Sequence, residues 1–161
     1  MKNNCGLYIH IPFCSSKCLY CDFYSKADSK EEINTYVTHM LWAIEKFGKE
    51  YNGKIFDTIY IGGGTPSVIG TNNLYSIITA AKKHFNIINP EITIEMNPCT
   101  AGKIDFEKLK NTGVNRISLG VQSANENELK KLGRIHRNND VKSAVEKIKS
   151  SGIDNISLDL M

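Results

Sequence analysis

The chain of 161 residues lacks any apolar run that approaches the ~18 residues needed for a transmembrane helix. It also lacks a basic-then-apolar signal segment, a low-complexity tract and a linker rich in glycine and proline. Its net charge is only +3, and its basic residues are scattered, with no run of five or more. These absences argue against a membrane span and against a nucleic-acid or anionic-membrane partner. We therefore expect one domain in the cytoplasm, where thiols stay reduced.

The sequence also lacks an even number of cysteines and a second C-x2-C pair. Of its five cysteines, Cys14, Cys18 and Cys21 form a C-x3-C-x2-C motif directly after a short apolar segment. These three lie too close together to pair sensibly with one another, so a metal or cluster site fits better than a disulfide framework. We expect Cys5 and Cys99 to be plain thiols.

Thiolates are the usual protein ligands of iron–sulfur clusters, and they also bind zinc. Three thiolates bind three irons of a cubane and leave the fourth iron without a protein ligand, which makes that iron a chemical site. A structural zinc site needs four protein ligands instead. Zinc completed by His10, Cys5 or Cys99 is therefore the alternative interpretation of the same motif.

Strand-like and helix-like segments alternate along the chain. Apolar residues fall on one helical face in residues 33–44, 74–85 and 141–148. The expected strands are residues 7–11, 55–61, 92–96, 114–119 and 153–160. Gly113 and Gly152 stand where helix C-terminal glycines are expected, just before the next strand. This alternation predicts βαβ units and a parallel sheet.

The expected strands carry apolar residues on one face and polar residues on the other. In the third strand, Ile92, Ile94 and Met96 alternate with Thr93 and Glu95. A parallel strand covered by helices on both faces normally reads as a continuous apolar run. We therefore predict an α/β fold whose strands form a barrel or part-barrel, with apolar residues toward outer helices and polar residues toward an interior cavity. An open sheet with one wet face is the alternative.

Four segments around the cysteine motif carry further information: residues 8–14 (YIHIPFC), 62–67 (GGGTPS), 95–98 (EMNP) and 116–123 (RISLGVQS). Together, and in this order, they resemble the radical S-adenosylmethionine (SAM) superfamily and, within it, the oxygen-independent coproporphyrinogen III oxidase family. The resemblance runs from Tyr8 to Met161 and implies a (β/α)6 part-barrel.

The chain stops inside its last expected strand, so we expect residues 1–161 to be the N-terminal part of a radical SAM core domain. The remaining barrel units and a C-terminal domain would be absent. Such a fragment is expected to leave an edge strand unpaired and part of its core exposed.

In the family that the chain resembles, the three cysteines hold a [4Fe–4S] cluster whose open iron binds the amino and carboxylate groups of SAM. One electron from the cluster then splits the sulfonium to a 5′-deoxyadenosyl radical. The resemblance thus implies SAM, a reducing electron donor protein and a tetrapyrrole, either haem or coproporphyrinogen III, as partners. The apolar Phe13, Leu19 and Phe23 are expected to shield the cluster, to pack in the core, or both.

The resemblance also implies which residues contact SAM, although it assigns no catalytic residue. The matching positions are Tyr8, Tyr20, Gly63, Gly64, Thr65, Glu95, Gln122, Arg134 and Asp159. Glycines let the backbone approach a ligand closely, and a guanidinium suits a carboxylate. The plainer interpretations are an ordinary glycine turn, a solvated strand residue for Glu95 and a solvated helical face for Arg134. For His10, a satisfied core histidine is the safer interpretation.

Phe23 distinguishes two branches of the family. The oxidase branch typically carries a fourth cysteine two residues after the third, and Phe23 occupies that position here. This departure resembles the haem chaperone branch, which shares the cluster and SAM site and delivers haem to an acceptor protein. We therefore favour a haem chaperone, whose haem-binding residues would lie largely beyond Met161. An anaerobic coproporphyrinogen III oxidase, which converts two propionates to vinyl groups, is the alternative, and a zinc-binding structural module is the remote one.

Overall fold

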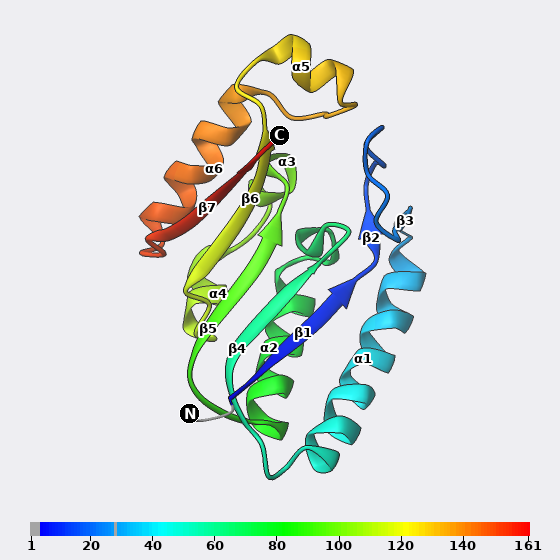
Figure 1. The fold of residues 1–161 in the computed structure, drawn as a ribbon, viewed down its shortest axis with the longest axis vertical. Helices are drawn as coiled ribbons and strands as arrows, with labels where there is room; N and C mark the ends of the chain where they lie inside the picture. The colour runs from blue at the N-terminus through cyan, green and yellow to red at the C-terminus, as the bar shows by residue number, and fades with distance from the viewer. Residues whose placement is uncertain (1–3, 28) are drawn as a thin grey trace.

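The computed structural model describes residues 4–27 and 29–161, and its centre is a parallel β-sheet (Figure 1). Within these residues, five strands pair in chain order: β1 (Cys5–Ile11), β4 (Ile55–Gly63), β5 (Asn86–Met96), β6 (Arg116–Gln122) and β7 (Asn155–Leu160). The five predicted strands are confirmed, although their ends differ. β5 begins at Asn86 rather than Ile92, because its backbone already pairs there with Ile55 of β4.

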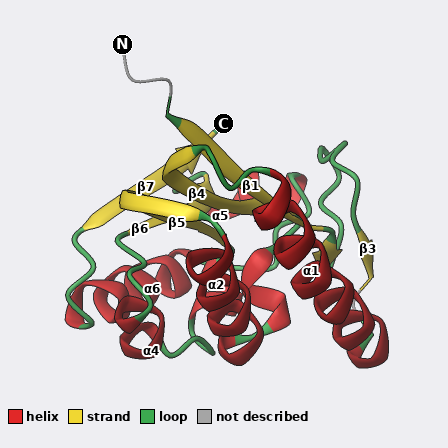
Figure 2. Cartoon of the chain, turned by 90° about the horizontal axis from the view of Figure 1, so that it is seen from below, coloured by secondary structure: helices red, strands yellow, loops and turns green. Residues whose placement is uncertain are grey.

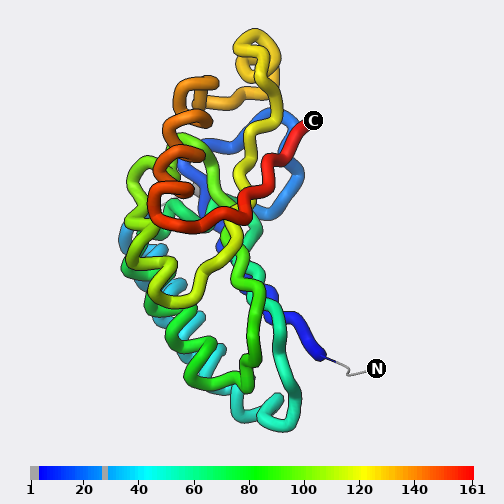
Figure 3. Tube along the Cα trace, turned by 90° about the vertical axis from the view of Figure 1, so that its left-hand side faces the viewer, coloured from blue at the N-terminus to red at the C-terminus, as the bar shows by residue number. Residues whose placement is uncertain are grey.

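Three long helices connect the strands: α1 (Lys30–Glu50), α2 (Thr71–His84) and α6 (Asn138–Ser150). They lie on one side of the sheet, whose opposite face is open (Figures 2 and 3). Shorter segments complete the connections: η1 (Pro66–Ile69), α3 (Pro98–Ala101), α4 (Phe106–Asn111) and α5 (Glu126–Lys131). Because crossovers between parallel strands share one hand, sequential strand order places the long helices on one face. The result is the curved wall of a part-barrel, as predicted.

None of the helices that the structure describes combines the length and the apolar character of a membrane span.

The hydrophobic core lies between the sheet and the helices. The helix-facing apolar residues of the central strands and the sheet-facing residues of α2 are fully buried there: Ile59, Ile61, Ile92, Ile94, Ile117, Leu119, Leu74, Ile77 and Ile78. Burial of each such side chain stabilises the fold by roughly 1.5–3 kcal/mol. The predicted alternation is therefore confirmed in the middle of the sheet. On the edge strand β7 the apolar residues of this pattern are not buried: Leu158 is 48% and Leu160 is 69% exposed.

A two-stranded pair that the sequence pattern does not predict frames the cysteine loop. β2 (Phe13–Cys14) and β3 (Lys26–Ala27) pair beside the end of β1, and the Lys26 N–H donates to the Pro12 carbonyl at 2.9 Å. This pair closes the cysteine loop, residues 15–25, at the carboxyl end of the sheet. Strands of two residues carry no periodicity, which is why the sequence does not reveal them.

Candidate functional site

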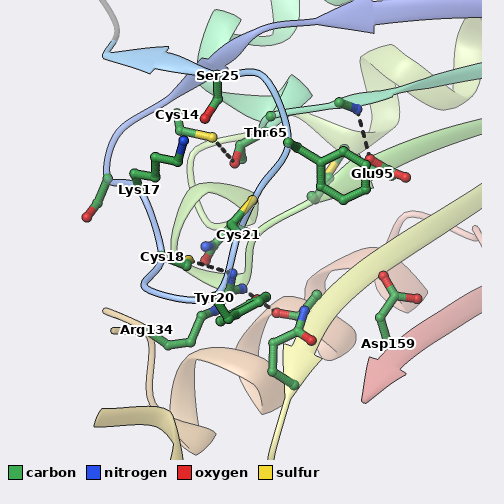
Figure 4. Close-up of a pocket in the computed structure, with 18 of the residues that line it drawn as sticks. Cys14, Lys17, Cys18, Tyr20, Cys21, Ser25, Thr65, Glu95, Arg134 and Asp159 are labelled. Atoms are coloured by element: carbon green, nitrogen blue, oxygen red, sulfur yellow. Dashed lines mark hydrogen bonds between the residues drawn. The ribbon is translucent and has the colours of Figure 1, made fainter. Parts of the chain in front are cut away.

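A pocket of about 410 Å³ opens at the carboxyl ends of the strands, a size typical of sites for small ligands. Every residue that the sequence implicates in cluster or SAM binding lines it, except Tyr8. These residues are Cys14, Cys18, Cys21, Tyr20, Gly63, Gly64, Thr65, Glu95, Gln122, Arg134 and Asp159. In Figure 4 the cysteine loop forms one side of the pocket, while Glu95 and Asp159 project from the strands opposite. The barrel topology thus gathers residues that are up to 145 positions apart, from Cys14 to Asp159.

The three motif cysteines are half-buried, and all are free thiols. Cys14 ends β2, and its Sγ lies 3.5 Å from the Thr65 hydroxyl oxygen. Cys18 and Cys21 follow in the loop, where the Cys21 N–H donates to the Cys18 carbonyl at 3.2 Å. The other two cysteines, Cys5 and Cys99, do not line the pocket.

Of the three apolar residues expected to shield the cluster, to pack in the core, or both, only Phe13 packs in the core. Phe13 is 2% exposed and belongs to the core, where its ring and that of Tyr36 pack in a T-shaped arrangement. Leu19 is 80% and Phe23 is 69% exposed, because the loop turns away from the helices that bury Phe13. Phe23 nevertheless lines the pocket, so the residue that distinguishes the two branches faces the site.

The glycine turn after β4 packs directly against the start of the cysteine loop. The Gly64 N–H donates to the Ile11 carbonyl and the Thr65 N–H to the Phe13 carbonyl, both at 2.8 Å. A Cβ on Gly64 would lie 2.6 Å from the Phe13 carbonyl oxygen and 3.0 Å from the Cys14 Sγ. Glycine is therefore required here for close approach of two backbone segments, which makes the turn a support for Cys14 as well as a pocket wall.

Glu95 of β5 is half-buried and held from the neighbouring strand β4. The Tyr60 hydroxyl donates to one carboxylate oxygen at 2.6 Å, and the Gly63 N–H donates to the other at 3.0 Å. Burial, together with the hydrogen bond to Glu95 and its charge, raises the pKa of Tyr60, so its hydroxyl stays a donor at neutral pH. Glu95 is therefore not a freely solvated strand residue. Tyr60 supports the site although it lies outside the recognised sequence segments. Its polar position in the strand alternation does place it on the same face of the sheet as Glu95.

Arg134 lies in the loop after α5 and not on a solvated helical face. Its Nη2 donates to the Gly120 carbonyl at 2.5 Å, and its Nη1 lies 3.4 Å from the Cys18 Sγ. The Nε–H donates to Nδ1 of His136 at 3.3 Å. Figure 4 shows the side chain reaching from this loop toward the cysteine loop. Arg134 thus places a fixed positive charge beside a motif thiol.

The last two strands supply the remaining polar groups. The hydroxyl oxygen of the buried Ser118 lies 3.0 and 3.1 Å from the two carboxylate oxygens of Asp159. Gln122 takes a left-handed backbone conformation, with φ of +68°, where the register between β6 and β7 shifts. A Cβ on Gly120 would come within 3.0 Å of the Gln122 amide nitrogen, so glycine leaves room for that side chain.

Tyr8 and Tyr20 differ in their relation to the pocket. Tyr20 lines it, and burial is the main cause of its raised pKa, which Arg134 opposes. Tyr8 is 57% exposed on β1, stacks on Tyr60 and places its hydroxyl oxygen 3.0 Å from Nδ1 of His10. The structure therefore brings Tyr20 to the site and leaves Tyr8 on the open face of the sheet.

The donor set fits an iron–sulfur cluster with an amino-acid ligand better than a zinc ion. In the described part of the chain, no three side chains of His, Cys, Asp or Glu converge closely enough to hold one metal ion. A structural zinc site would need four such ligands around one point. The three thiols instead border a pocket that also carries carboxylates, Glu95 and Asp159, and a guanidinium, Arg134. These charges complement a ligand that has both an ammonium and a carboxylate group.

The sequence of this chain was compared with protein families and with known proteins. Residues 8–161 match the radical SAM superfamily. The haem chaperone HemW of Buchnera aphidicola subsp. Acyrthosiphon pisum is 44% identical over 159 residues, and that of Escherichia coli is 40% identical over 159 residues. Each alignment covers 97% of this chain and 42% of the relative. The chain therefore spans about two-fifths of the length of these relatives.

A solved structure shares the fold. The coproporphyrinogen III oxidase HemN from Escherichia coli superimposes with a TM-score of 0.85 and 23% sequence identity, over 96% of this chain and 36% of that one. At this identity the likeness concerns the fold, and it confirms the prediction that the parallel strands and outer helices form part of a larger barrel.

Proposed function

Because this chain belongs to the radical SAM superfamily, whose members in general use SAM and a [4Fe–4S] cluster, we propose that Cys14, Cys18 and Cys21 hold such a cluster at the pocket. The observation that carries this proposal is that one pocket contains the three thiols, two carboxylates and an arginine. The cluster, when bound, supplies an electron at low potential.

The other pocket residues bind and orient SAM. Arg134 pairs with its carboxylate, since a guanidinium offers paired N–H donors that match two carboxylate oxygens. Glu95, which is already oriented by Tyr60 and Gly63, accepts hydrogen bonds from the ammonium or the ribose. The remaining contacts come from Tyr20, Gly63, Gly64, Thr65, Gln122 and Asp159. Tyr8 lies outside the pocket lining but stacks on Tyr60, the residue that orients Glu95, and its contact with SAM stays part of the proposal.

Residues 1–161 correspond to the N-terminal part of a radical SAM core domain. The support is that the chain covers 42% of the HemW relatives and 36% of HemN while matching both over nearly its whole length. The free thiols suit a reducing compartment, which favours the cytoplasm.

Within the superfamily, we assign the protein to haem delivery. Two observations support this: relatives at 44% and 40% identity are haem chaperones, and Phe23 stands at the pocket where the oxidase branch has a fourth cysteine. The partners would be haem, a haem-acceptor protein and a reducing electron donor protein. The alternative function is oxidation of coproporphyrinogen III, and the second experiment below distinguishes it from haem delivery.

Two experiments test the proposal. Anaerobic reconstitution with iron and sulfide should give a brown protein with about four irons per chain. A colourless protein with one bound zinc would contradict the cluster assignment. The protein in its full length should then bind haem stably and leave coproporphyrinogen III unchanged in the presence of SAM and a reductant. Formation of a vinyl product would assign it to the oxidase branch instead.

A further inference from the structure

His136 is a buried histidine next to Arg134 of the pocket, and the proposed function gives it no role. It lies in the loop between α5 and α6, and only 1% of it is exposed. Its two ring nitrogens contact two different partners: Nδ1 lies 3.3 Å from Nε of Arg134, and Nε2 lies 3.0 Å from the Val121 carbonyl oxygen. A buried imidazole with both nitrogens engaged is a fixed part of its surroundings.

The two partners define the protonation state of His136. A carbonyl oxygen only accepts, so Nε2 must carry the proton in its bond to Val121. The Nε–H of an arginine only donates, so Nδ1 of His136 must offer its lone pair to Arg134. An imidazolium has no lone pair and would repel the guanidinium. Burial and the charge of Arg134 lower the pKa of His136, which favours this neutral form.

The contacts of Arg134 leave part of its guanidinium available. The group has five N–H donors, and three of them point to His136, Gly120 and Cys18, while the Tyr20 hydroxyl also lies within hydrogen-bonding reach of the guanidinium. These contacts leave terminal N–H capacity on the pocket side. Terminal N–H groups of a guanidinium are the donors that pair with a carboxylate.

The loop presents Arg134 and His136 on the same side. Ile135 between them is 57% exposed, as expected when alternate residues of an extended segment face opposite ways. The Arg134 N–H donates to the Leu129 carbonyl at 2.9 Å, and the Arg137 N–H donates to the Asp140 carboxylate at 2.7 Å. Both ends of the segment are thus tied to helices, so the imidazole is a firm support for the guanidinium.

We propose that His136 is a positioning residue whose Nδ1 lone pair holds Arg134 in the orientation that binds the SAM carboxylate. This role rests on the proposed function, because it acts only through Arg134 at the SAM site. Without the imidazole acceptor, Arg134 keeps its contacts with Gly120 and Cys18 but loses the one that fixes Nε, so SAM would have to order part of the side chain, which lowers the affinity.

Two substitutions separate the two hydrogen bonds of His136. In His136→Asn, the side-chain oxygen lies near the Nδ1 position and keeps the acceptor for Arg134. In His136→Gln, the amide nitrogen reaches the Nε2 position, which keeps the donor for Val121 and loses the acceptor for Arg134. His39→Gln, at an exposed position of α1, is the matched control.

The dissociation constant for SAM is measured on cluster-loaded protein of each variant. We expect it to rise about tenfold in His136→Gln and by no more than about threefold in His136→Asn. In an Arg134→Ala background, His136→Gln should cause no further loss. Equal losses in both backgrounds, or an unchanged constant in His136→Gln, would overturn the positioning role and leave the proposed function intact.

Two further results complete the test. Should a His136 variant fail to fold, the imidazole 15N spectrum of the unsubstituted protein decides: a neutral ring protonated at Nε2 supports the role, and an imidazolium at neutral pH overturns it. Cluster-loaded protein that does not bind SAM at all would overturn the proposed function, and the role of His136 with it.

Discussion

The cysteine loop and the strand wall opposite it line the same pocket, but they are held in very different ways. The strand wall is formed by Glu95 of β5, Ser118 of β6 and Asp159 of β7. In the loop, Leu19 is 80%, Phe23 69% and Tyr24 74% exposed. Its backbone is tied by the Cys21 to Cys18 hydrogen bond and by the Leu19 N–H, which donates to the Leu132 carbonyl at 3.2 Å. In the wall, by contrast, Glu95 and Asp159 are each hydrogen-bonded from a neighbouring strand whose other face packs in the core.

This difference indicates what fixes the positions of the side chains in the loop and in the wall. The wall is ordered by the protein itself, because sheet pairing and side-chain hydrogen bonds already fix its polar groups. The loop buries little apolar surface, since Leu19, Phe23 and Tyr24 are exposed, so its local stability is low. We infer that the thiols gain their final arrangement from the cluster that they bind, whereas the SAM-binding groups are in place beforehand.

The largest expected effect comes from removing a thiol from the loop. Cys18→Ala should abolish stable cluster binding, because two protein thiolates are too few to hold a cubane that normally has three. Iron content and visible absorbance after reconstitution measure this. Cys99→Ala is the control, since Cys99 lies outside the pocket, and it should load normally. An unchanged cluster in Cys18→Ala would mean that another cysteine is a ligand.

The next effect should appear in the wall, and only in SAM binding. Glu95→Gln removes a charge that two donors orient, so the affinity for SAM should fall by about 1.5–3 kcal/mol, the range for hydrogen bonds to charged groups. Cluster content should not change. Glu91→Gln on the same strand removes an exposed carboxylate outside the pocket and serves as the control. Loss of the cluster in Glu95→Gln would contradict the claim that the wall acts on SAM binding alone.

Gly64→Ala tests the junction between the two halves. The new Cβ would clash with the Phe13 carbonyl, so the free energy of unfolding should fall by about 1–3 kcal/mol, and cluster binding should weaken as Cys14 is displaced. Urea denaturation and iron content give the two readouts. Gly53→Ala, with no atom within 4 Å of the added Cβ, should leave both unchanged. A normally stable, normally loaded Gly64→Ala protein would show that the turn does not support the loop.

The smallest effect should come from Tyr60→Phe. It removes one hydrogen bond to Glu95, which should weaken SAM binding by about 0.5–1.5 kcal/mol without changing cluster content. Equilibrium binding of SAM, with Tyr75→Phe on the exposed surface as the control, measures it. A loss as large as that of Glu95→Gln would show that Glu95 depends on Tyr60 for its position entirely.

The sequence predicts the wall better than the loop, and the reason is physical. Alternation along a strand is a local property, so the parity of Ile94 and Met96 correctly assigns Glu95 to the polar face of β5. The same parity marks Tyr60, which lies outside the four recognised segments, and Ser118, which lies inside residues 116–123 but is not among the positions implied to contact SAM.

The path of a loop depends on contacts that local patterns do not encode. The position of Arg134 depends on the contact between the cysteine loop and the loop after α5, where the Leu19 N–H donates to the Leu132 carbonyl and a Cβ on Gly133 would lie 3.0 Å from the Leu19 side chain. His136, in the same loop, is held by Arg134 and by the Val121 carbonyl, which lie far apart in the local pattern. The helical-face interpretation is therefore wrong for Arg134, although Lys130 and Lys131 do lie exposed on α5, and only the three-dimensional structure separates them.

Hydrogen exchange of backbone amides, with and without the reconstituted cluster, tests the difference between loop and wall most directly. We predict that cluster loading slows exchange at least tenfold in residues 15–24, because ligation removes the local opening of the loop. Residues 92–96 and 117–121 should already be protected without the cluster and should not change. A loop that is equally protected in both states, or a wall that becomes protected only when the cluster is bound, would contradict this prediction.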